Sequence, residues 1–399
     1  MKILLVHNYY KQRGGEDESF EAEAKLLKAN GHEVQLYTRH NDEIDEMAKL
    51  KVAADMFWNR RTIRELSKVL SGFQADVIHC TNLFPIISAS AYKAAKLFSV
   101  PVVQSLRNYR HLCLNSFLYR EGAICEQCGT KSLPIAGITN SCYRNSTVGS
   151  GLLAAHNYIH NRRKTVVNGV DLFFTPSQFA REKYVQSGWP AEKIRVKPNF
   201  LADVPERENY DREFALFVGR LSEEKGVKTL IESWVEHQIP LPLKVVGDGF
   251  LSAYVEAQAR DHKNIYSEGR LELQQVQSLM ARSKFLVMPS QWYETFGRTM
   301  MEAFASGTPV IASDLGAMSE LVDDETNGLT FEQQNKSDLA KAVSRLISSE
   351  SLRVQLGKQA RISFENKYTA EINHDHLMRI YREAIALHSA EKTKLPGME

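Results

Sequence analysis

The stretch KFLVMPSQWYETFGRTMMEAFASGTPVIAS, residues 284–313, contains the pattern on which the whole chain is built. Its apolar start, 284–290, is typical of a buried strand. A polar loop leads to a segment whose apolar spacing predicts a helix, with Thr295 as N-cap and Gly307 at the end. The apolar run 308–313 follows as another strand. Strand, helix and strand in this order predict a parallel α/β unit.

The same alternation extends through both halves of the chain. Further apolar, β-branched runs lie at 2–8, 32–38, 75–80, 100–106, 213–221, 241–249 and 264–269. Near-continuous apolar runs are typical of parallel strands covered on both faces. The fold class is therefore α/β, with two doubly wound, Rossmann-like domains facing across a ligand cleft.

A charged, proline-bearing segment without hydrophobic periodicity, 197–213, divides the two halves. We expect an N-terminal domain over 1–200, with a cysteine-rich insertion at about 107–145. A C-terminal domain should cover 212–368. The segment 369–399 is expected to form a helix that packs back toward the N-terminal domain.

Bulk composition excludes several classes of protein. A chain of 399 residues exceeds what one core usually supports, and its formal net charge of +2 gives no electrostatic case for nucleic-acid binding. No apolar run is long enough to span a membrane, and the N-terminus reads as a core strand, not as a signal peptide. The expected location is the cytoplasm.

Two cations follow the predicted strand at 213–218. Arg220 and Lys225 lie in VGRLSEEKGVKTLIES, residues 218–233, just before a predicted helix. An arginine fork, a lysine and a helix N-terminus together suit an anion such as a diphosphate. A solvated charged loop fits the same residues.

Two glutamates lie eight residues apart in the opening stretch. Glu294 falls in the loop and Glu302 more than one turn into the helix, so both can face one ligand. Carboxylates accept hydrogen bonds from the hydroxyls of a polyol, and backbone amides near Gly297 can hold phosphate. Alternatively, Glu302 pairs with a nearby arginine and Glu294 is a loop charge.

Residues 294–302, ETFGRTMME, resemble the E-x7-E signature of glycosyltransferase family 4, whose members are retaining enzymes of the GT-B fold. The resemblance continues in family order through VGRLSEEKGV (218–227) and GTPVIASDLGAMSELV (307–322). HNYYKQRGGEDESFEAEAKLL, residues 7–27, resembles the entry loop and first helix of one branch of the family. The resemblance thus covers nearly the whole chain. It implies that the domain over 1–200 binds the acceptor and that the domain over 212–368 binds the nucleotide-sugar donor.

This resemblance implies a role for each matching residue. Arg220 and Lys225 would hold the donor diphosphate, Glu294 would contact the donor sugar, and Glu302 would bind the ribose. Gly14 and Gly15 would let the first loop approach phosphate and acceptor, and backbone near Arg270 would read the base. The full donor-binding set is Gly14, Gly15, Gly219, Gly247, Arg270, Phe296, Gly297, Arg298 and Glu302.

One position departs from the family pattern. Many members carry a histidine followed by Asp or Asn after the fourth strand, near the anomeric carbon, and here Arg107 and Asn108 stand at that place. Arg107 is therefore a candidate catalytic residue beside Glu294, Arg220 and Lys225. It could instead face an anionic acceptor or solvent.

Cys113, Cys125, Cys128 and Cys142 have the spacing C-x11-C-x2-C-x13-C. Four thiolates could form a structural zinc site that orders the long insertion. Thiols scattered in a loop fit the same spacing. The family resemblance implies no catalytic metal, so zinc is the one cofactor we consider.

Basic residues are dense around this insertion. They could dock an anionic lipid headgroup or a lipid-linked diphosphate at the inner membrane face, and an ordinary solvated charged helix is the alternative. They are Arg107, Arg110, Arg120, Arg144, His156, His160, Arg162, Arg163 and Lys164.

The expected function is that of a hexosyltransferase-type glycosyltransferase. It would move a sugar from a UDP- or GDP-sugar to a hydroxyl of a saccharide or lipid-linked acceptor, with retention, in cell-surface polysaccharide or lipid-linked saccharide synthesis. The alternatives are a nucleotide-sugar epimerase and a non-catalytic nucleotide-sugar-binding protein on the same fold.

Overall fold

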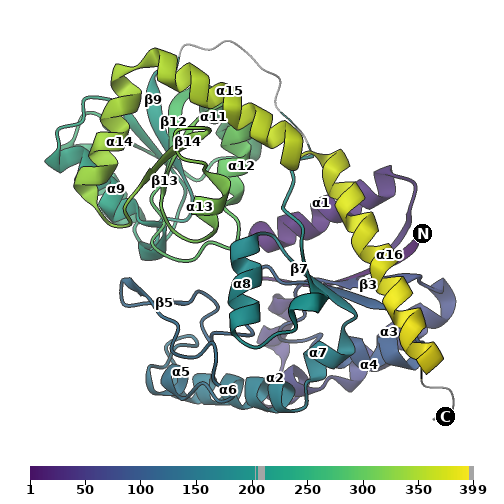
Figure 1. Ribbon diagram of the computed structural model, residues 1–399. Coiled ribbons are helices and arrows are strands. Elements are labelled where there is room, and N and C mark those ends of the chain that lie inside the picture. Colours follow the sequence, from purple (N-terminus) through teal and green to yellow (C-terminus); the bar gives the residue numbers. More distant parts are fainter. Residues whose placement is uncertain (203, 205–211, 395–399) are drawn as a thin grey trace. The chain divides into compact units, whose positions relative to one another are not determined.

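The computed structural model describes residues 1–202, 204 and 212–394, which form two compact units (Figure 1). Unit 1 contains 1–117, 126–197 and the chain from Asn373 onward, and unit 2 contains 118–125 and 198–372. Part of the predicted linker, 203 and 205–211, lies outside the described residues.

The hairpin of β5 (Tyr119–Arg120) and β6 (Ala123–Ile124) groups with unit 2, although the sequence places it in the insertion of the first domain. The Tyr119 hydroxyl donates a hydrogen bond to Gln291 Oε1 at 3.2 Å, which gives this hairpin a partner within unit 2.

Unit 1 contains a six-stranded parallel sheet in the order β2-β1-β3-β4-β7-β8. Because the chain moves from β1 to β2 and then returns to β3 on the other side of β1, the topology reverses between β1 and β3. The strands are β1 (Lys2–Tyr9), β2 (Glu33–His40), β3 (Val77–Cys80), β4 (Val102–Ser105), β7 (Leu172–Thr175) and β8 (Ile194–Val196). The helices are α1 (Gly15–Ala29), α2 (Lys49–Phe57), α3 (Arg60–Phe73), α4 (Ser90–Leu97), α5 (Ile135–Thr139), α6 (Thr147–Arg162), α7 (Thr165–Gly169) and α8 (Gln178–Gln186), with 3-10 helices at η1 (Asn41–Glu46) and η2 (Ala191–Lys193).

Unit 2 repeats this plan in the order β11-β10-β9-β12-β13-β14, and its topology reverses between β9 and β12. The strands are β9 (Phe214–Val218), β10 (Leu243–Val246), β11 (Ile265–Gly269), β12 (Ser283–Met288), β13 (Val310–Ser313) and β14 (Gly328–Phe331). The remaining elements are η3 (Glu223–Lys225), α9 (Val227–Glu236), α10 (Ser252–Asp261), α11 (Leu273–Arg282), α12 (Arg298–Ala305), α13 (Ala317–Leu321), α14 (Lys336–Ser348) and α15 (Glu350–Lys367).

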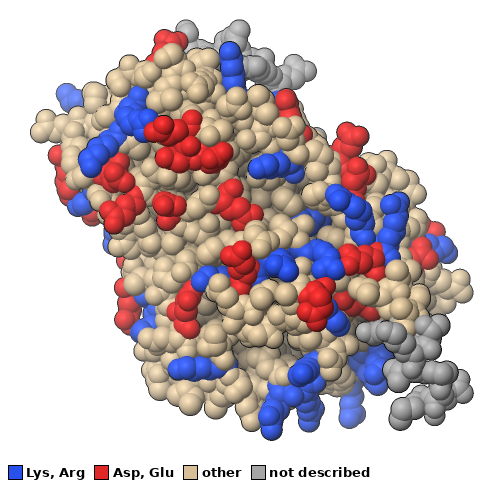
Figure 2. Space-filling view, viewed as in Figure 1, with Lys and Arg blue, Asp and Glu red and all other residues tan. Residues whose placement is uncertain are grey.

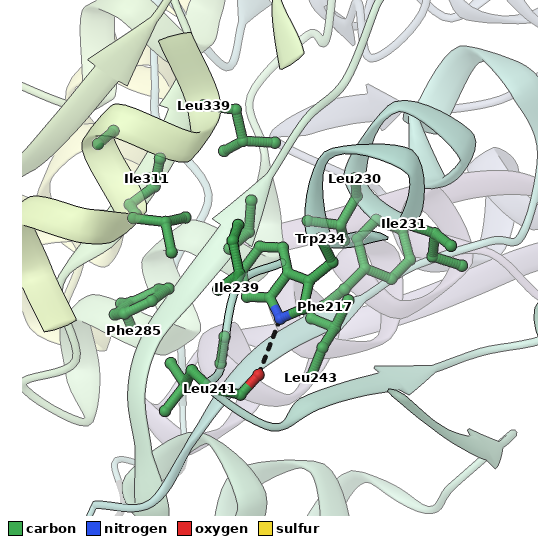
Figure 3. Close-up of a cluster of buried hydrophobic side chains, with 14 of the residues drawn as sticks. Phe217, Leu230, Ile231, Trp234, Ile239, Leu241, Leu243, Phe285, Ile311 and Leu339 are labelled. Carbon is green, nitrogen blue, oxygen red and sulfur yellow. Dashed lines mark hydrogen bonds between the residues drawn. The ribbon is translucent and has the colours of Figure 1, made fainter. Parts of the chain in front are cut away.

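Both faces of the second sheet are buried because alternate side chains of each strand point to opposite faces. Phe217 and Phe285 belong to the core under α9 and α14, while their neighbours Leu216 and Leu286 belong to the core under α12 and α15. Figure 3 shows Trp234 at the centre of the first core, where its indole N–H donates to the Leu241 carbonyl at 2.9 Å. This packing holds the carboxyl ends of the strands in fixed register.

The last helix, α16 (Ala370–Lys394), supplies core to unit 1. Leu377, Met378 and Tyr381 pack with Leu5 and Phe20 of β1 and α1. Residues 395–399 lie outside the described part of the chain.

The predicted fold class is confirmed for each unit, since both contain a parallel sheet covered by helices. The prediction of Thr295 as an N-cap is wrong. Phe296 is buried, so the chain continues into the core before it turns, and Gly297 occupies the N-cap of α12 with φ of 90°. Gly307 does follow the helix in the left-handed conformation, with φ of 61°.

Candidate functional site

The predicted donor residues of unit 2 gather at the carboxyl ends of its central strands. Arg220 and Lys225 follow β9, Gly247 follows β10, and Glu294 follows β12. β9 and β12 are neighbours and flank the point where the topology reverses. Ligands of doubly wound sheets bind at this position.

Lys225 and Glu294 form the closest charged contact at this edge. Lys225 Nζ donates to Glu294 Oε1 at 2.5 Å, and Ser290 Oγ donates to the same oxygen at 2.8 Å. The lysine side chain is 16% exposed and that of the glutamate 7%, so both groups are largely withdrawn from water. The Lys225 ammonium also lies 5.4 Å from the ring centroid of Trp292. A cation and a carboxylate are thus held together at the edge where ligands of doubly wound sheets bind.

Gly226 explains how Lys225 comes so close to the loop after β12. Its φ is 71°, and a Cβ at this position would lie only 1.8 Å from the Pro289 carbonyl oxygen. Only glycine permits both this backbone conformation and this approach. The amide of Gln291 donates to the Glu224 carbonyl at 2.8 Å, which joins the two loops a second time. Gly226 is not among the site residues predicted from the sequence, although its place beside Lys225 and before a helix is a usable signal.

Gly247 has a similar constraint beside Gly219. Its φ is 143°, and an added Cβ would lie 1.9 Å from the Gly219 carbonyl oxygen. The two predicted glycines therefore let the ends of β9 and β10 meet closely.

Arg220 and Arg270 are more exposed than Lys225. Arg220 Nε lies 3.7 Å from Glu224, with a side chain that is 55% exposed, and Arg270 lies 4.0 Å from Asp248. Both side chains are accessible to a ligand at the same edge of the sheet.

On α12, Arg298 Nε donates to Glu302 Oε1 at 3.1 Å, which is the pairing that the alternative interpretation of Glu302 expects. The Phe296 ring packs edge-on against Tyr368, with centroids 5.6 Å apart, so its side chain belongs to the core. Only the backbone of Phe296 can therefore face a donor.

In unit 1, Gly14 and Gly15 form the start of α1, with Gly14 at the N-cap. The Gly14 amide donates to Asp17 Oδ2 at 3.1 Å, and Asp17 Oδ1 is 2.8 Å from His7 Nε2. The first turn also contains Glu16 and Glu18. Three carboxylates at this helix start disfavour an anionic ligand there and suit hydroxyl groups better.

Arg107 lies in a buried ion-pair cluster. Its Nη2 and the Nζ of Lys197 each lie 2.7 Å from Glu23 Oε1, and all three side chains are at most 6% exposed. Burial alone would raise the pKa of Glu23, but the charges of Arg107 and Lys197 lower it to about 2. Burial lowers the pKa of Lys197 to about 8 despite the nearby carboxylate. The guanidinium of the predicted catalytic residue Arg107 is thus engaged by Glu23.

The cysteines of the predicted zinc site are partly buried. Cys113 and Cys128 are buried, and Cys125 and Cys142 are intermediate. Over 1–202, 204 and 212–394, the structure places no group of three or more His, Cys, Asp or Glu side chains so that they could hold a metal ion.

Unit 1 also contains a cavity of about 70 Å³ that the sequence did not predict. It lies beyond the carboxyl ends of β3 and β4, and its wall includes Arg110, His111, His156 and His160. Arg110 Nη2 donates to the Tyr10 hydroxyl at 3.2 Å, and its guanidinium stacks 4.4 Å from the Phe84 centroid.

The three histidines of the cavity are held neutral. Burial lowers the pKa of His111 to about 3 and that of His156 to about 4, and it also lowers the pKa of His160. Neutral imidazoles each offer one donor and one acceptor, which suits uncharged hydroxyl groups. Four members of the predicted basic group, Arg107, Arg110, His156 and His160, line this cavity, and Arg107 is at the same time paired with Glu23.

No helix in the described part of the chain is long and apolar enough to cross a membrane.

Comparisons with known proteins agree with these observations. The family model for glycosyl transferases group 1 matches residues 202–363, and the model for a glycosyl transferase 4-like domain matches 14–199. An uncharacterized glycosyltransferase of Methanocaldococcus jannaschii is 35% identical over 175 residues, which cover 43% of this chain and 49% of that protein. Spore coat protein SA of Bacillus subtilis is 25% identical over 407 residues, which cover 96% of this chain and all of that protein.

Among solved structures, Anabaena HepE in complex with UDP has a TM-score of 0.67 and 16% identity, and the match covers 95% of this chain and 99% of HepE. This likeness identifies the fold of both units as GT-B. Together with the two family models, it shows that the chain belongs to glycosyltransferase family 4 and is a hexosyltransferase-type glycosyltransferase.

Proposed function

We propose that this enzyme transfers a sugar from a nucleoside diphosphate donor to a hydroxyl of a saccharide or lipid-linked acceptor, with retention of anomeric configuration. We place the reaction in the synthesis of a cell-surface polysaccharide or lipid-linked saccharide. The observation that carries the proposal is the Lys225–Glu294 contact of 2.5 Å at the β9/β12 edge. Family membership favours transfer over the epimerase and binding-protein alternatives.

Each side chain at this edge has a proposed task. As the bond between the anomeric carbon and the diphosphate breaks, negative charge grows on the leaving phosphate, and Lys225, Arg220 and the first amides of α12 would stabilise it. Glu294 would accept hydrogen bonds from the sugar, and Glu302 from the ribose. When the donor binds, the Lys225–Glu294 contact would thus be replaced by a contact of Lys225 with phosphate and a contact of Glu294 with the sugar.

We propose UDP as the nucleotide to test first, because HepE, which shares the fold, has been crystallised with UDP and with UDP and glucose. Thermal-shift measurements with UDP, GDP and ADP separate the donor classes, since a ligand that binds the native state raises the midpoint by mass action.

We also propose that transfer needs no catalytic metal, because Lys225, Arg220 and helix amides supply positive charge to the diphosphate. Activity should then survive EDTA. Structural zinc at the four cysteines stays a prediction, and metal analysis of the purified protein tests it.

The decisive experiment incubates a radiolabelled UDP-sugar with candidate acceptors and determines the anomeric configuration of the product by NMR. We expect a product with the configuration of the donor. Conversion of the donor sugar without transfer would support an epimerase, and binding without any reaction would support a binding protein. Either result would overturn the proposal.

A further inference from the structure

Residues 127–170 contain no aspartate or glutamate. An even spread of the chain's 48 acidic residues would place about five in a stretch of this length. The same stretch carries the basic residues Lys131, Arg144, Arg162, Arg163 and Lys164. Its charge is therefore entirely positive, in a protein whose overall charge is close to zero.

Helix α6 runs through this stretch, and it has one buried face and one exposed apolar stripe. Ser150, Leu153, Ala154, Asn157 and His160 are buried against the rest of unit 1. On the opposite side Val148 is 84% exposed and Leu152 is 38% exposed, one turn apart, and Ile159 continues the same stripe. A surface helix normally presents charged or polar residues to water. From Thr147 to Asn161, α6 presents no acid, Lys or Arg at all.

The neighbouring segment extends this apolar stripe. Helix α5 packs against α6, and Ile135 at its start is 58% exposed, with Leu133 at 38%. Lys131 and Arg144 lie before α6, Arg162 is its last residue, and Arg163 and Lys164 follow it, all exposed. We call this surface the basic apolar face. It consists of the five basic residues and of Leu133, Ile135, Val148, Leu152 and Ile159.

Figure 1 shows α5 and α6 along the lower margin of unit 1. In Figure 2 this lower margin shows Lys and Arg side chains among uncharged surface and no acidic group. The basic apolar face is thus accessible on the side of unit 1 away from its core.

We propose that the basic apolar face docks on an anionic lipid bilayer, with α6 lying in the plane of the membrane surface. Apolar tips on one side of a helix enter the boundary between headgroups and acyl chains, and flanking Lys and Arg attract anionic lipid. Scattered apolar side chains suit a fluid bilayer better than a protein partner, which requires a complementary surface. The absence of acidic residues removes the repulsion that lipid phosphate would meet.

Docking on a bilayer would make the lipid-linked acceptor of the proposed function easier to reach. The test of docking needs neither donor nor acceptor. The full chain is sedimented with vesicles of phosphatidylcholine alone or mixed with an equal part of phosphatidylglycerol. We expect binding to the mixed vesicles, at least tenfold weaker binding to phosphatidylcholine alone, and release by salt.

Variants locate the surface. Val148→Glu with Leu152→Glu should abolish vesicle binding. Arg162→Gln with Arg163→Gln should weaken vesicle binding about tenfold or more, because each basic side chain contributes a several-fold increase in affinity. Val354→Glu with Ile362→Glu is the matched control, because these residues are 49% and 46% exposed on α15 of unit 2. That control should bind as the wild type does.

Circular dichroism and the UDP-induced thermal shift confirm that each variant is folded. A wild type that ignores phosphatidylglycerol vesicles would overturn the proposal, as would a Val148/Leu152 variant that binds them normally. The proposal would also be overturned if the wild type formed a dimer without lipid and the Val148/Leu152 variant did not, because the face would then bind a second copy of the chain. A failure of sugar transfer with intact vesicle binding would count only against the proposed function.

Discussion

At the scale of single residues, Lys225 combines two effects that substitution can separate. It neutralises Glu294, which is only 6% exposed, and it is proposed to hold the leaving diphosphate. Lys225→Met should lower turnover by about 10²–10³-fold, as for other groups that stabilise developing charge. It should also cost about 1–3 kcal/mol of stability, because Glu294 loses a charged partner.

The double variant Lys225→Met with Glu294→Gln distinguishes these effects. Removing both charges should restore most of the stability and none of the activity, as measured by denaturant unfolding and by transfer kinetics. Lys228→Met is the control, since Lys228 lies three residues further on in an exposed pair with Glu223 at 3.4 Å. Activity that returns in the double variant would contradict the role of Lys225.

Glu23 gives unit 1 a specific pH dependence. Its pKa is about 2 in the folded protein and 4.5 ordinarily, so between these values the unfolded state binds more protons. Its contribution to stability, on the order of 3 kcal/mol, is complete above pH 4.5 and is lost as the pH falls toward 2. Unfolding of wild type and Glu23→Gln at pH 7 and near pH 3 should show a large difference that shrinks on acidification.

Two comparisons sharpen this test. Glu33→Gln removes an exposed carboxylate 3.9 Å from Lys2 and should change stability by less than about 1 kcal/mol at either pH. Arg107→Met should lose stability together with activity, because Glu23 would keep only Lys197. Lost activity with unchanged stability would instead support the predicted catalytic role of Arg107.

The sequence could predict that Lys225 and Glu294 lie at one edge of the sheet, but it could not predict the cluster around Glu23. The first two belong to short motifs beside strand ends, where topology brings them together whatever the rest of the chain does. Arg107 and Lys197 lie 84 and 174 positions from Glu23, and no local spacing relates them. Their meeting depends on how α1, β4 and the end of β8 pack.

At the scale of elements, the turn from η3 into α9 depends on Gly226. Gly226→Ala would combine a left-handed φ of 71° with a Cβ 1.8 Å from a carbonyl oxygen, so the loops after β9 and β12 must separate. We expect a loss of about 2 kcal/mol or more of stability and a large loss of UDP affinity. Unfolding curves and calorimetry with UDP measure the two effects.

Gly151→Ala is the matched control for this substitution. Gly151 lies inside α6 with nothing within 4 Å of an added Cβ, so alanine should stabilise the helix by about 0.5–1 kcal/mol. UDP affinity should not change. If Gly226→Ala behaves like this control, then the close approach of the two loops is not needed for the site.

The sequence predicted that the strands and helices exist better than it predicted the residues at which they begin. The strands with continuous apolar runs, such as 213–221 and 284–290, were predicted because burial on both faces leaves a strong signal. The start of α12 was placed at Thr295 by cap chemistry, but burial of Phe296 moved it to Gly297. Tertiary packing sets that helix start, and it cannot be predicted from local residue preferences.

At the scale of the whole molecule, the last helix completes a core that begins at the first strand. Tyr381 of α16 is fully buried in unit 1, and its hydroxyl lies 2.8 Å from His79 Nδ1 on β3. Leu377 and Met378 pack beside it against Leu5 and Phe20. Unit 1 therefore needs both ends of the chain, and unit 2 is enclosed between them in the sequence.

Tyr381→Ala should accordingly destabilise unit 1 by about 3–5 kcal/mol, because a large buried side chain leaves a cavity. Tyr381→Phe keeps the packing and loses one hydrogen bond, at about 1 kcal/mol. Unit 2 contains the proposed donor site and its own two cores, so UDP should still shift its unfolding in both variants. Calorimetric unfolding with and without UDP measures this. Loss of the UDP response in Tyr381→Ala at a temperature where unit 2 is folded would show that the two units do not fold separately.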